Sequence, residues 1–277
     1  MPLPHADTSP GASQPSSARA GTFRHRIEGM PASRLPVFTP AALRFLRALE
    51  RNNRREWFHA RREEYDTLLR EPMARVVEQL AIDFRTMAPD LRADVSVSLF
   101  RPWRDTRFSA DKKPLKTHIA AVFPHRQLGR MRGAGLYVEV APTWVWMGGG
   151  LYAPDAAQLY AVRAHIAEHH ETLAALLRRP TFRRYLGTLS GNTISRVPRG
   201  FDRAHPAADW LRHTQLIAAR EEVAAFATRP AFYRELRATF RALVPLIDFL
   251  NEPLLALEAE RRRDPLADDD GGYRPLR

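Results

Sequence analysis

The chain has 277 residues, of which 44% are hydrophobic and 27% charged, with a formal net charge of +12 and no cysteine. Disulfide bonds and thiolate metal sites are therefore excluded, and no apolar run approaches the roughly 18 residues that a membrane helix requires. We expect a cytoplasmic protein with no membrane partner, whose positive charge suits an anionic ligand or a nucleic acid.

The N-terminal segment 1–36 is rich in Pro, Ser, Ala and Gly and has few large apolar residues. It cannot bury enough surface to offset the entropy lost on ordering, so we predict a disordered tail. Thr39 is a favourable N-cap, and it predicts a helix over 40–51. Asn52 and Asn53 are expected to end this helix, because Asn tolerates the left-handed conformation.

Two further helices and a strand are predicted before the middle of the chain. Apolar residues at helical spacing indicate helices over 55–69 and from Pro72 to the residues before Pro89. The period then changes, because Val and Leu alternate with Ser over 95–99. This alternation is typical of a strand with one buried face.

The middle of the chain predicts the rest of a sheet. Apolar residues over 118–123 indicate a strand, and alternation over 136–140 and 144–147 indicates a hairpin. The glycines at 148–150 are expected to end that hairpin. A mostly antiparallel sheet is the simplest arrangement of these segments.

The C-terminal half is predicted to be largely helical, with neither an internal repeat nor a domain boundary. The fold class is therefore α+β, a single domain over 37–260 with a mostly antiparallel sheet flanked by N-terminal and C-terminal helices. The helices are expected over 155–177, 180–189 and 210–217 and from about Pro230 past Phe249, and the tail 261–277 is expected to be disordered.

The strongest chemical signal is the basic loop, residues 99–118, which has six Lys or Arg against two Asp. The 43 basic residues of the chain include three lysines, and all three lie in this loop, at 112, 113 and 116. An ammonium group is a compact point charge, whereas a guanidinium is a planar fork, so the two are not interchangeable. Phe100, Trp103 and Phe108 are interleaved with the charges.

The basic loop predicts an anion-binding site. Arginines spaced by three residues can point the same way in a tight or extended segment, and their forks bind carboxylate or phosphate through two hydrogen bonds. Lysines would add point charges, and nearby hydroxyls would add donors. The candidate ligand-binding residues are Arg101, Arg104, Arg107, Ser109, Lys112, Lys116 and Thr117.

Two acidic residues of the basic loop, Asp105 and Asp111, have alternative roles. They could orient the arginines, or act as metal ligands or acid–base groups, which makes them the candidate catalytic residues. If they face a pocket without Arg partners, chemistry is plausible. If an Arg holds each of them, binding or structural support is the better interpretation. Two acids cannot pair with all six cations, which favours a site over a self-satisfied network.

A second basic stretch precedes the helix predicted at 55. Arg54 and Arg55 lie near a helix start, where the helix dipole disfavours cations, so a neighbouring anion could compensate them. We add both to the ligand-binding candidates. The alternative is structural, with Asn53 capping the helix and Trp57 in the core. The sequence does not show whether this stretch contacts the basic loop.

The sequence predicts no metal site and no cofactor. His165, Glu168 and His169 have the H-x-x-E-H order of inverted zinc peptidases. A catalytic zinc needs a third protein ligand and an open position, and no downstream motif indicates the ligand, although Glu221 or Glu222 could be proposed. Walker-type and G-x-G-x-x-G phosphate loops are also missing from the sequence.

Four motifs together resemble one protein family. They are RDTRFSADKKPLKT at 104–117, NNRREWF at 52–58, GGGLYAP at 148–154 and PRGF at 198–201. In this order, and over roughly Val37 to Leu257, they resemble the domain of unknown function 2461 family. Members commonly have an aromatic residue where this chain has Leu115 and Lys where it has His213, whereas Lys112 and Lys116 match. The resemblance implies the fold and the site but supplies no substrate.

Three functional hypotheses follow from the sequence. The first is a binding site, with or without catalysis, for a small anionic or phosphorylated ligand. The second is a nucleic-acid-associated module whose two basic stretches follow a phosphate backbone. The third is a domain in which the basic loop is purely structural. A concave pocket around the Arg and Lys tips favours the first, and an open basic stripe with exposed aromatics favours the second. The sequence leaves enzymatic activity and oligomeric state open.

Overall fold

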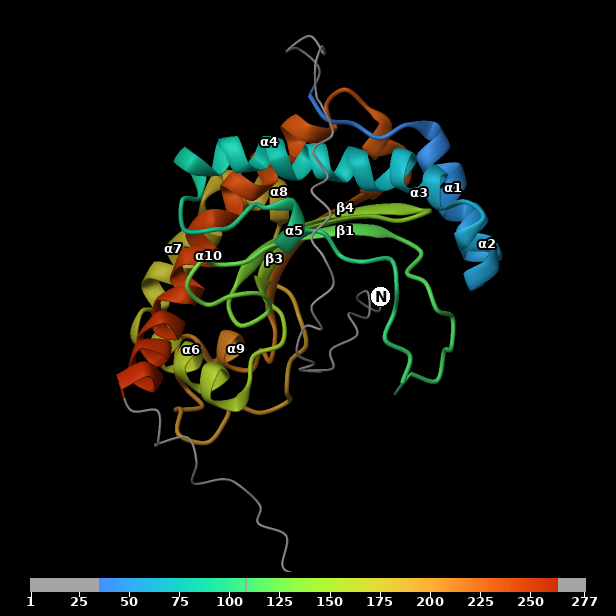
Figure 1. Cartoon of the computed structure of the whole chain (residues 1–277). Helices are drawn as coiled ribbons and strands as arrows, with labels where there is room; N and C mark the ends of the chain where they lie inside the picture. The colour runs from blue at the N-terminus through green and yellow to red at the C-terminus, as the bar shows by residue number, and fades with distance from the viewer. Residues whose placement is uncertain (1–34, 108, 264–277) are drawn as a thin grey trace, which may run out of the picture.

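A four-stranded antiparallel sheet lies at the centre of the molecule, in the order β1-β2-β3-β4 (Figure 1). The computed structural model describes residues 35–107 and 109–263. The strands are β1 (Ile119–Phe123), β2 (Gly135–Val140), β3 (Trp144–Leu151) and β4 (Leu216–Val223). The predicted α+β class with a mostly antiparallel sheet flanked by helices is confirmed.

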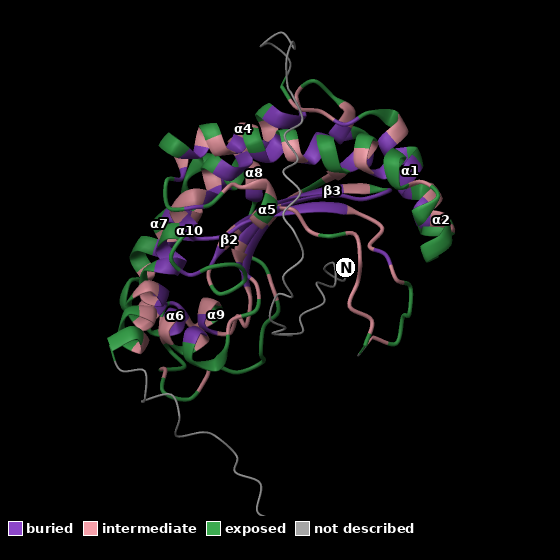
Figure 2. Cartoon of the chain, viewed as in Figure 1, coloured by how far each residue is buried: buried purple, intermediate pink, exposed green. Residues whose placement is uncertain are grey.

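The two faces of the sheet have different compositions. Val138, Met147 and Leu216 are fully buried on the first face, where the helices α4 (Glu71–Met87) and α10 (Phe232–Arg263) contact the sheet. Residues of the opposite parity form the second face, where Glu139 pairs with Ala120 on one side and Trp146 on the other. Figure 2 shows burial concentrated along the strands and the inner sides of the helices.

The predicted end of the hairpin at the glycines is wrong, because β3 continues through them. Gly149 pairs with Leu136 and Ala218. A Cβ atom at Gly149 would lie 2.3 Å from the carbonyl oxygen of Gly135, and Gly150 has a φ of +134°. Glycine therefore allows close strand approach here rather than ending the strand.

The N-terminal helices form one layer above the sheet in Figure 1. The N-cap Thr39 is confirmed, but Asn52 has a φ of −125° and ends α1 without the left-handed conformation. The helix predicted over 55–69 is interrupted at residues 60–61. The elements are α1 (Pro40–Arg51), α2 (Arg55–His59), α3 (Arg62–Tyr65), a π-helical turn η1 (Asp66–Arg70) and α4 (Glu71–Met87).

Pro72 does not begin a separate helix. It is the second residue of α4, which continues directly from the π-helical turn η1. Proline lacks an amide hydrogen and its ring clashes with the carbonyl of the preceding turn, and a wider π turn relieves both problems. The helix therefore passes Pro72 without ending.

The strand predicted over 95–99 is also wrong, since residues Val95–Ser98 form the short helix α5. The side chain of Asp94 accepts a hydrogen bond from the amide of Ser96 at 2.8 Å. Such a local side-chain bond competes with strand pairing. Within 95–99, Leu99 forms an isolated antiparallel β-bridge with Ala121 of β1.

The C-terminal half adds helices and the fourth strand. The helix predicted over 210–217 ends at Leu211, and Ile217 lies in β4, which the sequence reading missed. The elements are α6 (Ala156–Glu168), α7 (His170–Arg178), α8 (Pro180–Leu186), α9 (Ala208–Leu211), the 3-10 turn η2 (Ala224–Thr228) and α10 (Phe232–Arg263).

The predicted tails fall mainly outside the described residues. Residues 1–34 and 264–277 are not described, whereas residues 261–263 belong to α10. Across the residues that the structure describes, none of the helices combines the length and apolar character needed to span a membrane.

Candidate anion-binding site

The basic loop folds as an irregular hairpin. Trp103 pairs with Leu115 in an antiparallel bridge. The amide of Arg104 donates to the carbonyl of Pro114 at 2.9 Å, and the amide of Lys116 donates to the carbonyl of Pro102 at 2.8 Å. We call residues 99–104 and 114–118 the base of the loop and residues 105–113 its tip. Phe108 lies outside the described residues.

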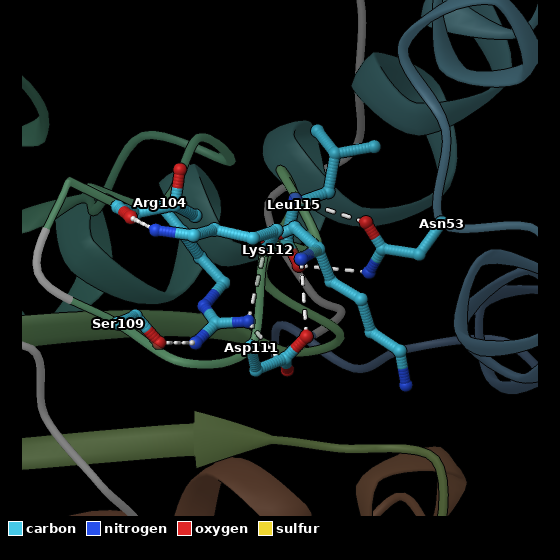
Figure 3. Close-up of polar contacts among 8 residues, drawn as sticks. Asn53, Arg104, Ser109, Asp111, Lys112 and Leu115 are labelled. Carbon is cyan, nitrogen blue, oxygen red and sulfur yellow. Dashed lines mark hydrogen bonds and ion pairs between the residues drawn. The ribbon is translucent and has the colours of Figure 1, made fainter.

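Asn53 joins the base of the loop to the helical layer. Its side-chain amide donates to the carbonyl of Leu115 at 2.8 Å, and its carbonyl oxygen accepts from the Leu115 amide at 3.0 Å (Figure 3). Leu115 itself is only 1% exposed. Asn53 thus bonds to the loop as a neighbouring strand would, and the two basic stretches of the sequence meet in space.

Aromatic packing completes this junction. The centroid of the Trp103 ring lies 5.4 Å from the centroid of the Phe58 ring and 5.7 Å from that of the His59 ring. The guanidinium carbon of Arg55 lies 5.9 Å from the Trp103 ring. Because Arg55 and His59 are four residues apart on α2, their side chains lie on the same side of that helix.

A pocket with a cavity volume of about 270 Å³ opens between α2 and the basic loop. Two guanidinium groups line it from segments far apart in the sequence, and none of the described lining residues is acidic. The lining residues are Arg55, His59, Trp103, Arg104, Thr106 and Pro114. Clefts with a few convergent polar groups are typical ligand sites.

The structure brings only part of the predicted set to this pocket. Arg55 and Arg104 line the pocket, whereas the other candidates are not among the described residues that line it. Those candidates are Arg54, Arg101, Arg107, Ser109, Lys112, Lys116 and Thr117. The sequence reading missed His59 and Thr106. The i,i+4 spacing from Arg55 to His59 could have indicated His59, because residues four apart lie on the same side of a helix.

Ion pairs hold the tip of the loop. Nη1 of Arg104 lies 2.8 Å from Oδ2 of Asp111, and its Nη2 donates to the hydroxyl of Ser109 at 3.4 Å (Figure 3). Nη2 of Arg107 lies 2.7 Å from Oδ2 of Asp105. Arg104 and Arg107 therefore hold different carboxylates.

Both aspartates are stabilised in the ionised form. Hydrogen bonds from Arg107 lower the pKa of the Asp105 carboxyl to about 2. Hydrogen bonds from the Lys113 amide and from Arg104 lower the pKa of the Asp111 carboxyl below its usual value. Charge-assisted hydrogen bonds of this kind favour the carboxylate over the acid.

Two of the lysines contact the loop itself. Nζ of Lys112 donates to the carbonyl of Thr106 at 3.0 Å. Nζ of Lys116 lies 4.6 Å from the centroid of the Phe100 ring, and the guanidinium carbon of Arg130 lies 4.2 Å from the same centroid. Cations at these distances are attracted to the electron-rich face of an aromatic ring.

The H-x-x-E-H segment packs against the core. The His165 ring lies 4.5 Å from the rings of both His169 and Phe249. Among the residues that the structure describes, there is no group of three or more His, Cys, Asp or Glu side chains arranged to hold a metal ion.

The fold and the site define an α+β domain in which the basic loop docks on an N-terminal helical layer beside an antiparallel sheet. The family model described as conserved hypothetical protein (DUF2461) matches residues 41–249, and the chain belongs to this family. The match includes α2, the basic loop and every residue that lines the pocket. No curated protein and no solved structure gives a significant match.

Proposed function

We propose that the protein binds a small anionic or phosphorylated ligand in the pocket between α2 and the basic loop. The observation that supports this most is the convergence of Arg55 and Arg104 on one concave site without an acidic lining residue. Guanidinium forks bind carboxylate and phosphate through paired, charge-assisted hydrogen bonds. The Thr106 hydroxyl and the His59 ring would add hydrogen-bonding groups.

The contacts of Arg104 favour binding because they fix its position. Asp111 and Ser109 hold its guanidinium group, so less side-chain entropy is lost when a ligand arrives. We assign Asp105 and Asp111 the orienting role rather than an acid–base role, because each is paired with an Arg and has a lowered pKa.

The aromatic residues weigh against the nucleic-acid alternative. Stacking of single-stranded bases requires exposed aromatic faces. Phe58 is buried, and Trp57, Phe100 and Trp103 are half-buried among other side chains. Among the described residues, the two basic stretches therefore display a pocket rather than an open stripe with stacking platforms.

Thermal unfolding with and without ligand tests this proposal. Inorganic phosphate and a panel of phosphorylated metabolites are added to the wild type, to Arg55→Ala and to the matched control Arg54→Ala. We expect at least one ligand to raise the melting temperature of the wild type and of Arg54→Ala but not of Arg55→Ala. A ligand at 100 times its Kd stabilises the native state by about 2.7 kcal/mol.

Two results would contradict the proposal. If no member of the panel shifts the wild type, or if Arg55→Ala responds as the wild type does, the basic loop has a structural role. Salt-dependent binding of DNA that the combined Arg54→Ala and Arg104→Ala substitutions weaken would favour the nucleic-acid alternative.

We also propose a cytoplasmic location. A chain without cysteine gains nothing from an oxidising compartment, and small phosphorylated ligands are abundant where metabolism occurs. Fractionation of cells that produce the tagged protein would test this, and recovery outside the cytoplasmic fraction would contradict it.

A further inference from the structure

The anion pocket has an apolar wall in addition to its two guanidinium groups. The indole ring of Trp103 and the ring of Pro114 form this wall, and both residues belong to the base of the basic loop. A free phosphate or carboxylate uses only the cations and the hydrogen-bond donors of the pocket, so it leaves the apolar wall in contact with water. The wall therefore favours a ligand that carries an apolar group beside its anionic group.

The size of the pocket also exceeds what inorganic phosphate needs. Its cavity volume is about 270 Å³, and one water molecule occupies roughly 30 Å³ in the liquid, so the pocket has room for roughly nine waters. This volume lies near the lower end of the range for pockets that enclose small organic ligands, about 300–1,000 Å³. A single ring that carries one anionic group suits such a volume.

The packing of Trp103 fixes the position of its ring. The ring meets Phe58 at an interplanar angle of 72°, and the backbone of Trp103 forms a bridge with the buried Leu115. The ring is nevertheless only half-buried, and it lines the pocket. An aromatic ring that its neighbours already hold in place loses little conformational freedom when a ligand packs against it.

Arg55 places the anion beside this ring. Its guanidinium carbon lies 5.9 Å from the centroid of Trp103, and no carboxylate of the described residues pairs with it. Its donors are therefore available to a phosphate or carboxylate, and a hydrogen bond holds that group at about 3 Å. The ring of His59 bounds the same space, with its centroid 5.7 Å from that of Trp103. A group attached to the anion must lie close to the indole.

These surroundings favour an aromatic ring over a saturated one. Aromatic rings attract guanidinium groups through their electron-rich faces, and they pair with other aromatic rings in offset-stacked or edge-to-face arrangements. A saturated ring of the same size gains the hydrophobic contribution alone. The pocket has space for one such ring, whereas the stacking of successive bases requires an open aromatic surface.

We propose that the ligand is a small aromatic anion, whose phosphate or carboxylate binds Arg55 and Arg104 and whose ring packs against Trp103. This inference rests on the proposed anion site and adds the chemical class of its ligand. Trp103 is the specificity-determining residue, because it contacts the ring of the ligand rather than its charge.

Isothermal titration calorimetry with two matched pairs of ligands tests this proposal. Phenyl phosphate is compared with cyclohexyl phosphate, and benzoate with cyclohexanecarboxylate, so that the members of a pair share the anionic group and the number of non-hydrogen atoms. We expect the wild type to bind the aromatic member of at least one pair about two- to tenfold more tightly than the saturated member. The pair that shows this preference identifies the anionic group.

Substitutions separate the contribution of the ring from that of the charge. Leucine keeps an apolar side chain but has no aromatic face, so Trp103→Leu should bind both members of the pair equally. The matched control Trp103→Phe should keep most of the preference. Arg55→Ala should weaken both members by the same factor, because they share the anionic group.

The aromatic ligand and the anion site fail in different ways in this experiment. Equal affinities of the wild type within both pairs, or a preference that Trp103→Leu leaves unchanged, would overturn the aromatic ligand and leave the anion site standing. No binding of any of the four ligands, together with no thermal shift by the phosphorylated metabolites, would overturn the anion site and with it the aromatic ligand.

NMR of the wild type decides the matter if Trp103→Leu fails to fold. In the complex with phenyl phosphate, we expect intermolecular NOEs between the ring protons of the ligand and the indole protons of Trp103. Trp103→Phe assigns these indole signals, because they disappear in that variant. Absence of the NOEs in a saturated complex would contradict the proposal.

Discussion

The base and the tip of the basic loop are held by different kinds of interaction. The base has backbone hydrogen bonds, the paired bonds of Asn53 and the buried side chain of Leu115. The tip has two ion pairs at the surface, in which the Arg107 side chain is 65% and the Asp111 side chain 52% exposed. One region relies on burial and the other on charge.

This difference indicates which region positions the pocket. Buried apolar contacts and satisfied hydrogen bonds contribute more to stability than surface ion pairs, whose median contribution is about 0–1 kcal/mol. Trp103, Pro114 and Arg104 line the pocket from the base, whereas Thr106 lines it from the tip. The base therefore fixes the shape of the site, and the tip adjusts the orientation of charge beside it.

The substitution with the largest expected effect is Trp103→Ala. It removes the ring that packs on Phe58 and His59 and that forms one wall of the pocket. Because Trp103 is half-buried, we expect a loss of about 2 kcal/mol in the free energy of unfolding, below the value for a fully buried Trp. Urea denaturation measures this loss, and phosphate binding should weaken with it.

The matched control is Trp103→Phe, which keeps an aromatic ring at the junction. It should retain most of the stability and of the phosphate response. Equal losses in both variants would mean that the indole itself, rather than aromatic packing, holds the base.

A smaller effect is expected for Asn53→Ala. It leaves the amide and the carbonyl of Leu115 without their partners, at a cost of about 1–2 kcal/mol in the free energy of unfolding. The matched control is Asn52→Ala, because the Asn52 amide bonds only locally, to the carbonyl of Ala48 at 2.8 Å. Hydrogen exchange of the Leu115 amide should rise in the first variant and not in the second. The same rise in both would refute the docking role of Asn53.

Sequence patterns predicted most of the fold but not the positions where local bonds override periodicity. The alternation over 95–99 indicated a strand, yet Asp94 caps a helical turn there. Gly148–Gly150 suggested an end to β3, although the close approach of β2 and β4 requires glycine at these positions. Both errors arise from contacts that hydrophobic patterning does not encode.

The candidate site was predicted in composition but not in geometry. The excess of cations indicated the basic loop, and the position of Arg54 and Arg55 near a helix start made both of them candidates. The pocket depends on Asn53 bonding to Leu115 across 62 positions of sequence, which no local pattern shows. Glu139 is buried in β2, although a charged residue within an alternating strand is ordinarily expected to face solvent.

Acidification probes the tip, where the smallest effect on stability is expected. Arg107 lowers the pKa of Asp105 to about 2, below its value in the unfolded chain. The stabilisation by this pair is therefore present above the unfolded-state pKa and is lost as the pH falls through about 2. NMR titration of the Asp105 carboxyl should show this low midpoint, and Arg107→Ala should return it toward the usual value.

Asp105→Asn should leave the melting temperature at pH 7 nearly unchanged, because the pair is at the surface. A usual midpoint in the wild type, or a large loss of stability in Asp105→Asn, would show that the tip is held by more than exposed charge.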